Sequence, residues 1–304
     1  MSKTRLLCLL PNLQGGGAER VMTYLMRGLN RDKFNITLAL GNATGPYIDL
    51  LPKDIELISL GQSSGLRSVP AICRLLRSRT FDVSFSMLSM NLAILTARSL
   101  TGKNIPVVLG ARNHYSRSIT AEARFARAKL RAVKVLYPRA DLIICVSEGV
   151  RDDLVRNFGI PRERSAVIHN PIELDTVRAA AENDPGHPWL GVENNLPVLV
   201  AVGKLQKAKA YDDLIEAFSM LRRQMPIRLL VLGEGPERAA IEAMIAGRKL
   251  TDDVQLLGFQ KNPYQYMARA TAFVHAARWE GFPNVLVEAM ACGLPVVATD
   301  CPSG

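Results

Sequence analysis

The chain of 304 residues is about twice as long as a typical domain, so its length favours two domains. A composition of 48% hydrophobic and 22% charged residues is that of an ordinary globular protein and excludes a fibrous or disordered one. The formal net charge of +10 favours an anionic partner, but only 6% of residues are aromatic and no nucleic-acid-binding motif is present, which argues against DNA or RNA.

Cysteine usage and the first residues both favour the cytoplasm. The five cysteines are dispersed and none belongs to a CxxC pair, which argues against a disulfide framework and against a zinc site. The apolar run at 6–10 follows a charged head but is too short for a signal peptide or a membrane span. We therefore expect a cytoplasmic protein that begins with a β-strand.

The first half of the chain alternates between short apolar runs and helical patterns. A strand is expected at 5–10, a helix at 21–29 and a strand at 35–40, which is the βαβ signature of a parallel sheet. Further runs without polar alternation are expected to be strands buried on both faces, at 83–86, 106–110, 142–146 and 166–169. These patterns predict a doubly wound α/β domain over residues 1–182.

The periodic pattern lapses in the middle of the chain and then restarts. Residues 183–197 are rich in Pro, Gly, Asn and Asp, which indicates a linker. A second doubly wound domain is expected over 198–304, with strands at 198–202, 229–232, 254–257, 272–275 and 296–298 and helices at 214–223, 238–246 and 285–291. Because a helix would normally follow and cover the last strand, we expect this domain to be truncated at its C-terminus.

A glycine-rich loop joins the first expected strand to the first expected helix. Gly15, Gly16 and Gly17 leave backbone N–H groups uncovered at a helix N-terminus, where an anion or a ligand hydroxyl can approach. The alternative is a tight turn with no ligand. A nicotinamide cofactor is not supported, because the loop is not GxGxxG and no acidic residue ends the next strand.

Two loops of the second domain carry further candidate binding residues. Gly203 and Lys204 end the strand at 198–202, and Lys209 follows on the same loop. Cations at the carboxyl end of a parallel strand suit a pyrophosphate, although a solvated run of charges is the alternative. Gly233 starts a similar glycine turn and is expected to line the same site.

The segment 280–288 is the most informative part of the sequence. Pro283 fits the first turn of a helix, which places Glu280 on the preceding loop and Glu288 on the second turn. The helical rise separates the two carboxylates by roughly 10 Å, too far for a glycosidase pair but suited to the two ends of an extended ligand. The free N–H groups at 281–284 add an anion site. Alternatively, Glu280 interacts only with the helix dipole and Glu288 is an exposed helix acid.

Four segments resemble glycosyltransferase family 4, in the order that this family has. They are GGGAERV at 15–21, VGKLQKAKAYDDLIEAF at 202–218, VLGEGPER at 231–238 and EGFPNVLVEAMACGLPVVATD at 280–300. The resemblance implies the GT-B fold, in which two Rossmann-like doubly wound domains face each other across a cleft. It also implies a retaining, metal-independent enzyme without a cofactor, whose substrate is a nucleotide diphosphate sugar.

The same resemblance implies roles for residues of the second domain. Glu280 is expected to contact hydroxyls of the donor sugar and Glu288 to bind the ribose. The residues that support the sugar and distal phosphate, in part through backbone amides, are Gly281, Phe282, Pro283, Asn284 and Val285. Lys204 and Lys209 would neutralise the departing diphosphate, although Lys204 stands where the family usually has an arginine and lacks its bidentate fork. Ala210 stands where glycine is usual, a change that we expect the loop to tolerate.

In the first domain, many family members carry a histidine near the end of the strand expected at 106–110. Arg112 aligns with that position here, and His114 is the nearest histidine. Either side chain is a candidate to stabilise the leaving phosphate, and His114 is also a candidate proton shuttle. The alternative for both is an ordinary loop residue.

The segment 119–139 combines basic residues with Phe125, Leu130, Val133 and Leu136, which predicts a basic amphipathic helix. Such a helix either lies on an anionic membrane face and reaches a lipid-linked acceptor, or packs on its own domain with its cations solvated.

The sequence thus predicts a retaining glycosyltransferase that moves a sugar, favoured to come from a UDP-sugar, to a glycan or lipid-linked acceptor. Surface-polysaccharide or lipopolysaccharide biosynthesis, in the cytoplasm or at the inner face of the membrane, is the expected setting. The alternatives are a GT-B-fold sugar-nucleotide epimerase and a non-catalytic fragment that binds sugar nucleotides or a membrane surface.

Overall fold

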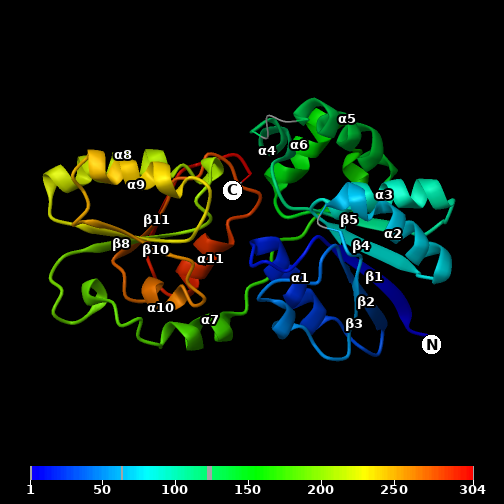
Figure 1. Ribbon diagram of the computed structural model, residues 1–304, viewed down its shortest axis with the longest axis horizontal. Helices are drawn as coiled ribbons and strands as arrows, with labels where there is room; N and C mark the ends of the chain where they lie inside the picture. The colour runs from blue at the N-terminus through cyan, green and yellow to red at the C-terminus, as the bar shows by residue number, and fades with distance from the viewer. Residues whose placement is uncertain (1, 63, 122–124, 304) are drawn as a thin grey trace. The chain divides into compact units, whose positions relative to one another are not determined.

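The computed structural model describes residues 2–62, 64–121 and 125–303. It divides into two compact units, Met1–Pro171 and Ile172–Pro302, each built on a parallel sheet with helices on its faces (Figure 1). The predicted pair of α/β domains is therefore confirmed. Within the described residues, no helix has both the length and the apolar composition that crossing a membrane requires.

The first unit contains seven parallel strands in the order β3-β2-β1-β4-β5-β6-β7. The strands are β1 (Thr4–Leu10), β2 (Phe34–Leu40), β3 (Glu56–Ser59), β4 (Val83–Met87), β5 (Val107–Ala111), β6 (Leu142–Cys145) and β7 (Ser165–Val167). The helices are α1 (Gly17–Gly28), α2 (Gly65–Ser78), α3 (Met90–Thr101), α4 (Tyr115–Ala121), α5 (Ala126–Leu136) and α6 (Glu148–Phe158). The strand order reverses between β1 and β4, and open α/β sheets bind ligands at the carboxyl ends of the strands at such a reversal.

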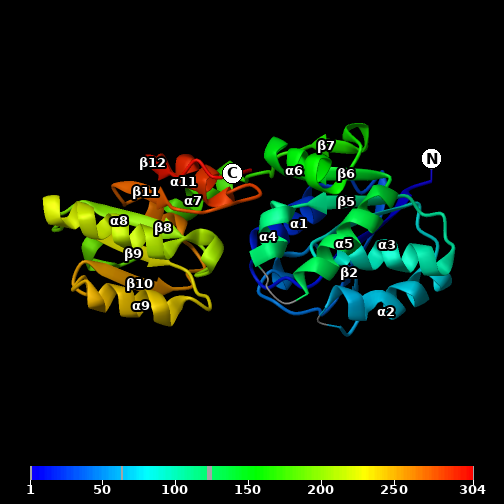
Figure 2. The ribbon, with the colours of Figure 1, turned by 90° about the horizontal axis from the view of Figure 1, so that it is seen from above.

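The central strand β1 is buried on both faces, as its apolar run predicted. Leu6, Cys8 and Leu10 pack in one cluster with the methionines of α1. Leu7 and Leu9 alternate with them, so they point to the other face, where they are also fully buried. Helices α2 and α3, which cover part of this sheet, lie side by side (Figure 2).

The basic segment 119–139 forms two helices where the sequence predicted one. The last turn of α4 and all of α5 fall within it, and residues 122–124 lie outside the described residues. Val133 of α5 is buried, and Leu130 and Leu136 are half-buried, because α5 packs against α3 and α4. Most of the predicted apolar face is therefore used inside the first unit.

The second unit contains five parallel strands in the order β10-β9-β8-β11-β12. The strands are β8 (Val198–Val202), β9 (Arg228–Leu232), β10 (Val254–Gly258), β11 (Ala272–His275) and β12 (Val296–Ala298). The helices are α7 (Leu174–Ala181), α8 (Tyr211–Gln224), α9 (Arg238–Gly247), α10 (Tyr264–Met267) and α11 (Asn284–Ala291). One face of the sheet packs on α8 and α9, and the other packs on α7, α10 and α11 (Figure 1). Here the strand order reverses between β8 and β11.

The division between the units lies at 171/172, ahead of the linker that the sequence indicated at 183–197. Val177 of α7 is buried in the same core cluster as Trp189 and Met267, so this helix belongs to the second unit. Trp189 itself is only 8% exposed, and the guanidinium of Arg228 lies 4.8 Å from its ring centre. A few buried apolar residues thus pack this segment against the second unit, although its Pro, Gly and Asn content is typical of a linker.

Candidate functional site

The strand reversal of the second unit gathers charged side chains from two loops. The chain leaves β8 and β11 in opposite directions, and the two strands are neighbours in the sheet. The β8 loop carries Lys209 within a 3-10 turn (Lys207–Lys209), and the β11 loop carries Glu280. These two residues, predicted from separate motifs, are in direct contact.

Glu280 is held by two donors at one of its oxygens. Its Oε1 accepts a hydrogen bond from Lys209 Nζ and lies 2.9 Å from Nε2 of His275, the last residue of β11. An ionised carboxylate only accepts hydrogen bonds, so the Nε2 of His275 carries the proton. The three side chains are 12%, 17% and 6% exposed for Glu280, Lys209 and His275.

The environment of Glu280 favours its charged form. Burial raises the pKa of this carboxyl, but the hydrogen bond from His275 and the positive charge of Lys209 outweigh burial and leave the pKa below its usual value. A carboxylate that stays charged although it is largely enclosed can accept hydrogen bonds from a hydroxylated ligand.

Arg278 ties the two loops together. Its backbone N–H donates to the carbonyl of Ala208 (2.9 Å), and its guanidinium donates to the carbonyl of Lys207 (3.0 Å). The same guanidinium lies 2.7 Å from Asp212 Oδ2 and 2.8 Å from Asp213 Oδ2, in the first turn of α8. It therefore fixes the β8 loop against the β11 loop, which keeps Lys209 close to Glu280.

Ala210 provides the turn between Lys209 and α8. Its backbone is in the left-handed region, with φ +51° and ψ +46°, and its side chain is fully buried. A residue with a Cβ costs roughly 1–2 kcal/mol in this conformation, which glycine adopts freely. The expected tolerance of alanine here thus comes with conformational strain.

Gly203 and Gly233 lie where the β8 and β9 loops meet. A Cβ on Gly233 would overlap the carbonyl oxygen of Gly203, because the β9 loop lies directly on the β8 loop. The hydroxyl of Tyr211 donates to the same carbonyl (3.1 Å). Close approach of the two loops explains Gly233 without a ligand, and the predicted role of both glycines in substrate binding stays a prediction.

Lys204 differs from Lys209 in its surroundings. It is exposed, and its side chain makes no hydrogen bond or ion pair with another described residue. The structure therefore does not bring Lys204 into the cluster around Glu280, although both lysines lie on the β8 loop.

Helix α11 (Asn284–Ala291) starts one residue before the range 285–291 expected from the sequence, and Pro283 lies just outside the first turn in which it was expected. Pro283 occupies the N-cap position, and the first helical residue is Asn284. Glu288 is only 4% exposed, so it is not the exposed helix acid that one interpretation of the sequence expected. The segment Gly281, Phe282, Pro283, Asn284 and Val285 forms the end of the β11 loop and the first turn of α11.

In the first unit, the glycine loop lies at the carboxyl end of β1, beside the strand reversal. Gly15 adopts φ +102°, Gly16 is the N-cap of α1 and Gly17 is its first residue. The carboxylate of Glu19 folds back against Gly16. The chain's own carboxylate thus lies where the sequence allowed for an external anion.

Arg112 follows β5, and its side-chain hydrogen-bond partners among the described residues are neutral. Its Nε lies 2.8 Å from Sδ of Met87, at the end of β4, and its guanidinium donates to Oδ1 of Asn170. Burial lowers the pKa of Arg112 to about 10, because an enclosed cation is poorly solvated.

His114 has different partners from Arg112. Its Nδ1 lies 3.1 Å from Oγ of Ser116 and 3.4 Å from Oδ2 of Asp153, a buried residue of α6. Oδ2 of Asp153 also accepts a hydrogen bond from the backbone of Ser116 (3.0 Å). These contacts give His114 a structural role at the start of α4, and they leave its predicted catalytic role untested.

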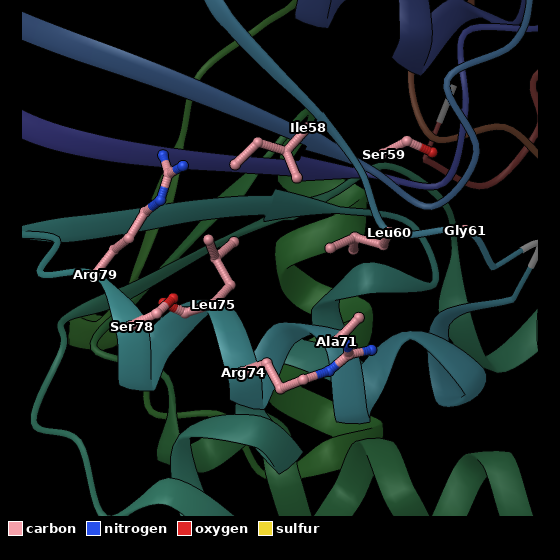
Figure 3. A pocket seen from close by; sticks show the side chains of 9 residues that line it. All are labelled: Ile58, Ser59, Leu60, Gly61, Ala71, Arg74, Leu75, Ser78 and Arg79. Atoms are coloured by element: carbon pink, nitrogen blue, oxygen red, sulfur yellow. The ribbon is translucent and has the colours of Figure 1, made fainter.

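A separate hollow of about 460 Å³ lies between β3 and α2, at the edge of the first sheet (Figure 3). Its lining residues are Ile58, Ser59, Leu60, Gly61, Ala71, Arg74, Leu75, Ser78 and Arg79. Arg79 is paired with Glu56, the first residue of β3 (2.5 Å). The hollow lies two strands away from β1, so it is not part of the strand reversal.

Known proteins match both halves of the chain. Residues 15–176 match the family model described as Glycosyltransferase Family 4, and residues 187–304 match the model described as Glycosyl transferases group 1. An N-acetylgalactosaminyltransferase of Campylobacter jejuni, which acts on a diphospho-undecaprenol-linked sugar according to its name, is 31% identical over 96% of this chain and 80% of its own length. The chain belongs to glycosyltransferase family 4.

Other relatives and solved structures agree with this assignment. The lipopolysaccharide 1,6-galactosyltransferase of Escherichia coli is 29% identical over 54% of this chain and 44% of its own length. The crystal structure of Anabaena Alr3699/HepE with UDP and glucose superposes with a TM-score of 0.78, at 23% identity, over 99% of this chain and 82% of that one. The lipopolysaccharide glycosyltransferase WaaG gives a TM-score of 0.76 at 19% identity over 98% of this chain and 82% of that one. The predicted GT-B fold is confirmed, and the protein is a glycosyltransferase, an enzyme of glycan assembly.

The sequence patterns did not single out two residues of this glycosyltransferase. His275 counted only as the end of a strand, and Arg278 was one basic residue among many. A signal for His275 was present, because it is a polar residue that ends a buried strand five positions before Glu280. Arg278 had no local signal, since its partners lie more than 60 residues away in the chain.

Proposed function

We propose that this glycosyltransferase transfers a sugar from a UDP-sugar to a lipid-linked or glycan acceptor, with retention at the anomeric carbon. The observation that carries the proposal is the cluster of Lys209, Glu280 and His275 at the strand reversal of the second unit. The name of the C. jejuni relative, with its undecaprenol-linked acceptor, and the UDP complexes of Alr3699/HepE support this choice of substrates.

In this proposal the second unit binds the donor. Within the described part of the chain, the side-chain donors to the Glu280 carboxylate contact Oε1, so Oε2 can accept a hydrogen bond from a hydroxyl of the donor sugar. Glu288, in the second turn of α11, binds the ribose. Lys209 lies beside the carboxylate and Lys204 is exposed on the same loop, and both cations offset the charge of the departing diphosphate.

Catalysis then depends on position and charge. The bond from the anomeric carbon to the diphosphate oxygen breaks, and the acceptor oxygen bonds to the same face of the sugar while its proton leaves with the diphosphate. The lysines and the backbone N–H groups at 281–284 stabilise the charge that develops on the leaving group, without a protein nucleophile.

A screen of UDP- and GDP-sugars against lipid-linked acceptors, read by mass spectrometry, tests this function. We expect transfer from a UDP-sugar that requires the acceptor. Isomerisation of the donor without an acceptor would instead identify an epimerase, and donor binding without turnover would identify a binding module.

We also propose that transfer needs no divalent metal, because lysines and helix N–H groups supply the positive charge near the leaving diphosphate. Transfer is expected to continue in EDTA at the rate measured without it. Loss of transfer in EDTA, with recovery on addition of Mg²⁺ or Mn²⁺, would contradict this proposal.

The exposed side of α5 is proposed to contact an anionic membrane. Arg127, Arg131 and Lys134 are exposed there, together with Phe125 (73% exposed) and Val135 (56% exposed). Cations flanked by exposed apolar side chains are typical of helices that lie on acidic lipid. Co-sedimentation with phosphatidylglycerol vesicles, but not with phosphatidylcholine vesicles, is expected and should be lost when the three cations are changed to Glu.

A further inference from the structure

His275 is a buried polar residue at the end of an otherwise apolar strand. It is 7% exposed, and its ring stacks on Phe273 with ring centres 6.3 Å apart and an angle of 24° between the planes. It pairs with Ala298 of β12, and its carbonyl oxygen accepts a hydrogen bond from the N–H of Thr299 (3.0 Å). Backbone and ring are both fixed, so Nε2 has a defined direction.

That direction is toward Glu280. Nε2 lies 2.9 Å from Oε1, the same oxygen that Lys209 contacts from the β8 loop. Lysine has a long and flexible side chain. The ring of His275, by contrast, is attached directly to a strand and stacks on Phe273. Of the two donors, His275 is therefore the one that can set the orientation of the carboxylate.

Charge and orientation are thus supplied by different residues. Lys209 provides a positive charge beside Glu280, and Arg278 fixes the 3-10 turn that carries Lys209. His275 provides a rigid hydrogen bond in one direction. With Oε1 bound on two sides, the carboxylate cannot rotate without losing both contacts.

We propose that His275 is a positioning residue, which holds Glu280 so that Oε2 faces a hydroxyl of the donor sugar. The inference rests on the proposed function for the identity of the ligand. It needs no contact between His275 and the substrate, because His275 acts through the Glu280 carboxylate.

Two substitutions separate the hydrogen bond from the volume of the ring. His275→Gln keeps an N–H donor near the position of Nε2, whereas His275→Leu fills a similar space without a donor. We expect His275→Leu to lower kcat/KM about 10²-fold, because misplacement of a positioned group by about 1 Å has an effect of this size. His275→Gln should recover most of this loss.

Binding measurements give a readout that a purely structural role would not move. The affinity for UDP alone should be the same in the unmodified chain and in His275→Leu, while the affinity for the UDP-sugar that gives transfer should fall at least tenfold. Equal losses for UDP and for the UDP-sugar would overturn the inference.

The matched control is His187 of the same unit, whose Nε2 lies 3.0 Å from Oε1 of Gln255. His187→Leu removes a similar hydrogen bond away from Glu280, and we expect it to leave kcat/KM unchanged. A loss as large as that of His275→Leu would show that the loss of any histidine hydrogen bond in this unit has this effect, and would also overturn the inference.

Crystal structures of the full chain make the test independent of the proposed function. The inference expects one orientation of the Glu280 carboxylate in the unmodified chain and in His275→Gln, and a different or mixed orientation in His275→Leu. An unchanged Glu280 in His275→Leu would overturn the positioning role even if the enzyme transfers sugar. A changed Glu280 in a chain that transfers no sugar from any donor would overturn the proposed function alone.

Discussion

The two strand reversals of this glycosyltransferase have the same topology and different chemistry. At the reversal of the second unit, Lys209, Glu280 and His275 are charged or polar side chains that contact one another at the ends of β8 and β11. Near the reversal of the first unit, Asn91 instead forms a network of neutral groups inside the unit. The fold thus fixes where a site can form, and a few side chains decide which kind of ligand it suits.

The neutral network of the first unit shows this difference well. Asn91 is fully buried, accepts a hydrogen bond from Ser86 (2.8 Å) and donates to the carbonyl of Gly110 (3.1 Å) and to the hydroxyl of Tyr137 (3.2 Å). The Tyr137 hydroxyl in turn donates to that of Tyr115 (3.0 Å). Such a network stabilises the ends of β4 and β5, whereas the second reversal brings a charged lysine and a carboxylate into contact.

The largest expected effect is that of Glu280→Gln. The substitution removes the charge that Lys209 and His275 surround, so we expect kcat/KM to fall about 10²-fold to 10³-fold, as when one group aligned with a transition state is lost. Steady-state transfer assays measure this. Glu216→Gln is the control, because Glu216 lies on the exposed face of α8 and pairs with Arg248. Similar losses in both variants would break the distinction between site and surface.

Arg278→Ala should have the next largest effect. It removes the side-chain contacts to Lys207, Asp212 and Asp213 that fix the β8 loop. We expect kcat/KM to fall roughly tenfold through loss of pre-organisation, with a change in stability below about 1 kcal/mol, because the guanidinium is partly exposed. The control is Arg248→Ala, which removes an exposed ion pair of the same unit. An unchanged kcat/KM in Arg278→Ala would show that the loop holds its shape without the arginine.

Arg112→Met tests the first unit. Arg112 is an enclosed cation whose described side-chain partners are neutral, so replacing it by a methionine of similar length should raise the free energy of unfolding by about 1 kcal/mol. If Arg112 also faces the leaving phosphate, kcat should fall while stability rises. Urea denaturation and transfer assays on the same sample measure both quantities. A fall in stability would show that the hydrogen bond to Asn170 outweighs the buried charge.

Ala210→Gly is expected to stabilise the second unit by roughly 1 kcal/mol, because glycine adopts φ +51° without the strain that a Cβ causes. The matched control is Ala208→Gly in the same loop, whose φ is not positive and where glycine should destabilise by roughly 0.5–1 kcal/mol. The midpoints of urea denaturation compare the two. Equal shifts of the same sign would contradict the assignment of strain to Ala210.

The smallest expected effect is a pH dependence of stability that comes from Glu280. Its folded-state pKa lies below the ordinary value of 4.5, so its charged form contributes stability above that pH, and this contribution is lost as the pH falls through the lowered pKa. The free energy of unfolding of the unmodified chain should therefore fall, relative to that of Glu280→Gln, as the pH is lowered below about 4.5. A difference between the two that does not change with pH would contradict the lowered pKa.

Local patterns in the sequence were enough for the sheets, because buried parallel strands have continuous apolar runs. The strands β1, β2 and β8 all follow such runs. The edge strand β3 gave no such signal, since three of its four side chains are exposed. The apolar residues of α5 were also recognised, but only its contacts with α3 and α4 show that Val133 packs inside the unit.

The sequence by itself determined two doubly wound domains, membership of glycosyltransferase family 4 and the candidate residues Glu280, Glu288 and Lys209. Only the tertiary structure decided that Lys209 contacts Glu280, that Lys204 stays outside the cluster, that Glu288 is buried and that His275 completes the arrangement. The physical reason is that apolar periodicity acts between neighbours in the chain. Contacts at the carboxyl ends of strands depend instead on the order of the strands, which brings Lys209 to a residue 71 positions away.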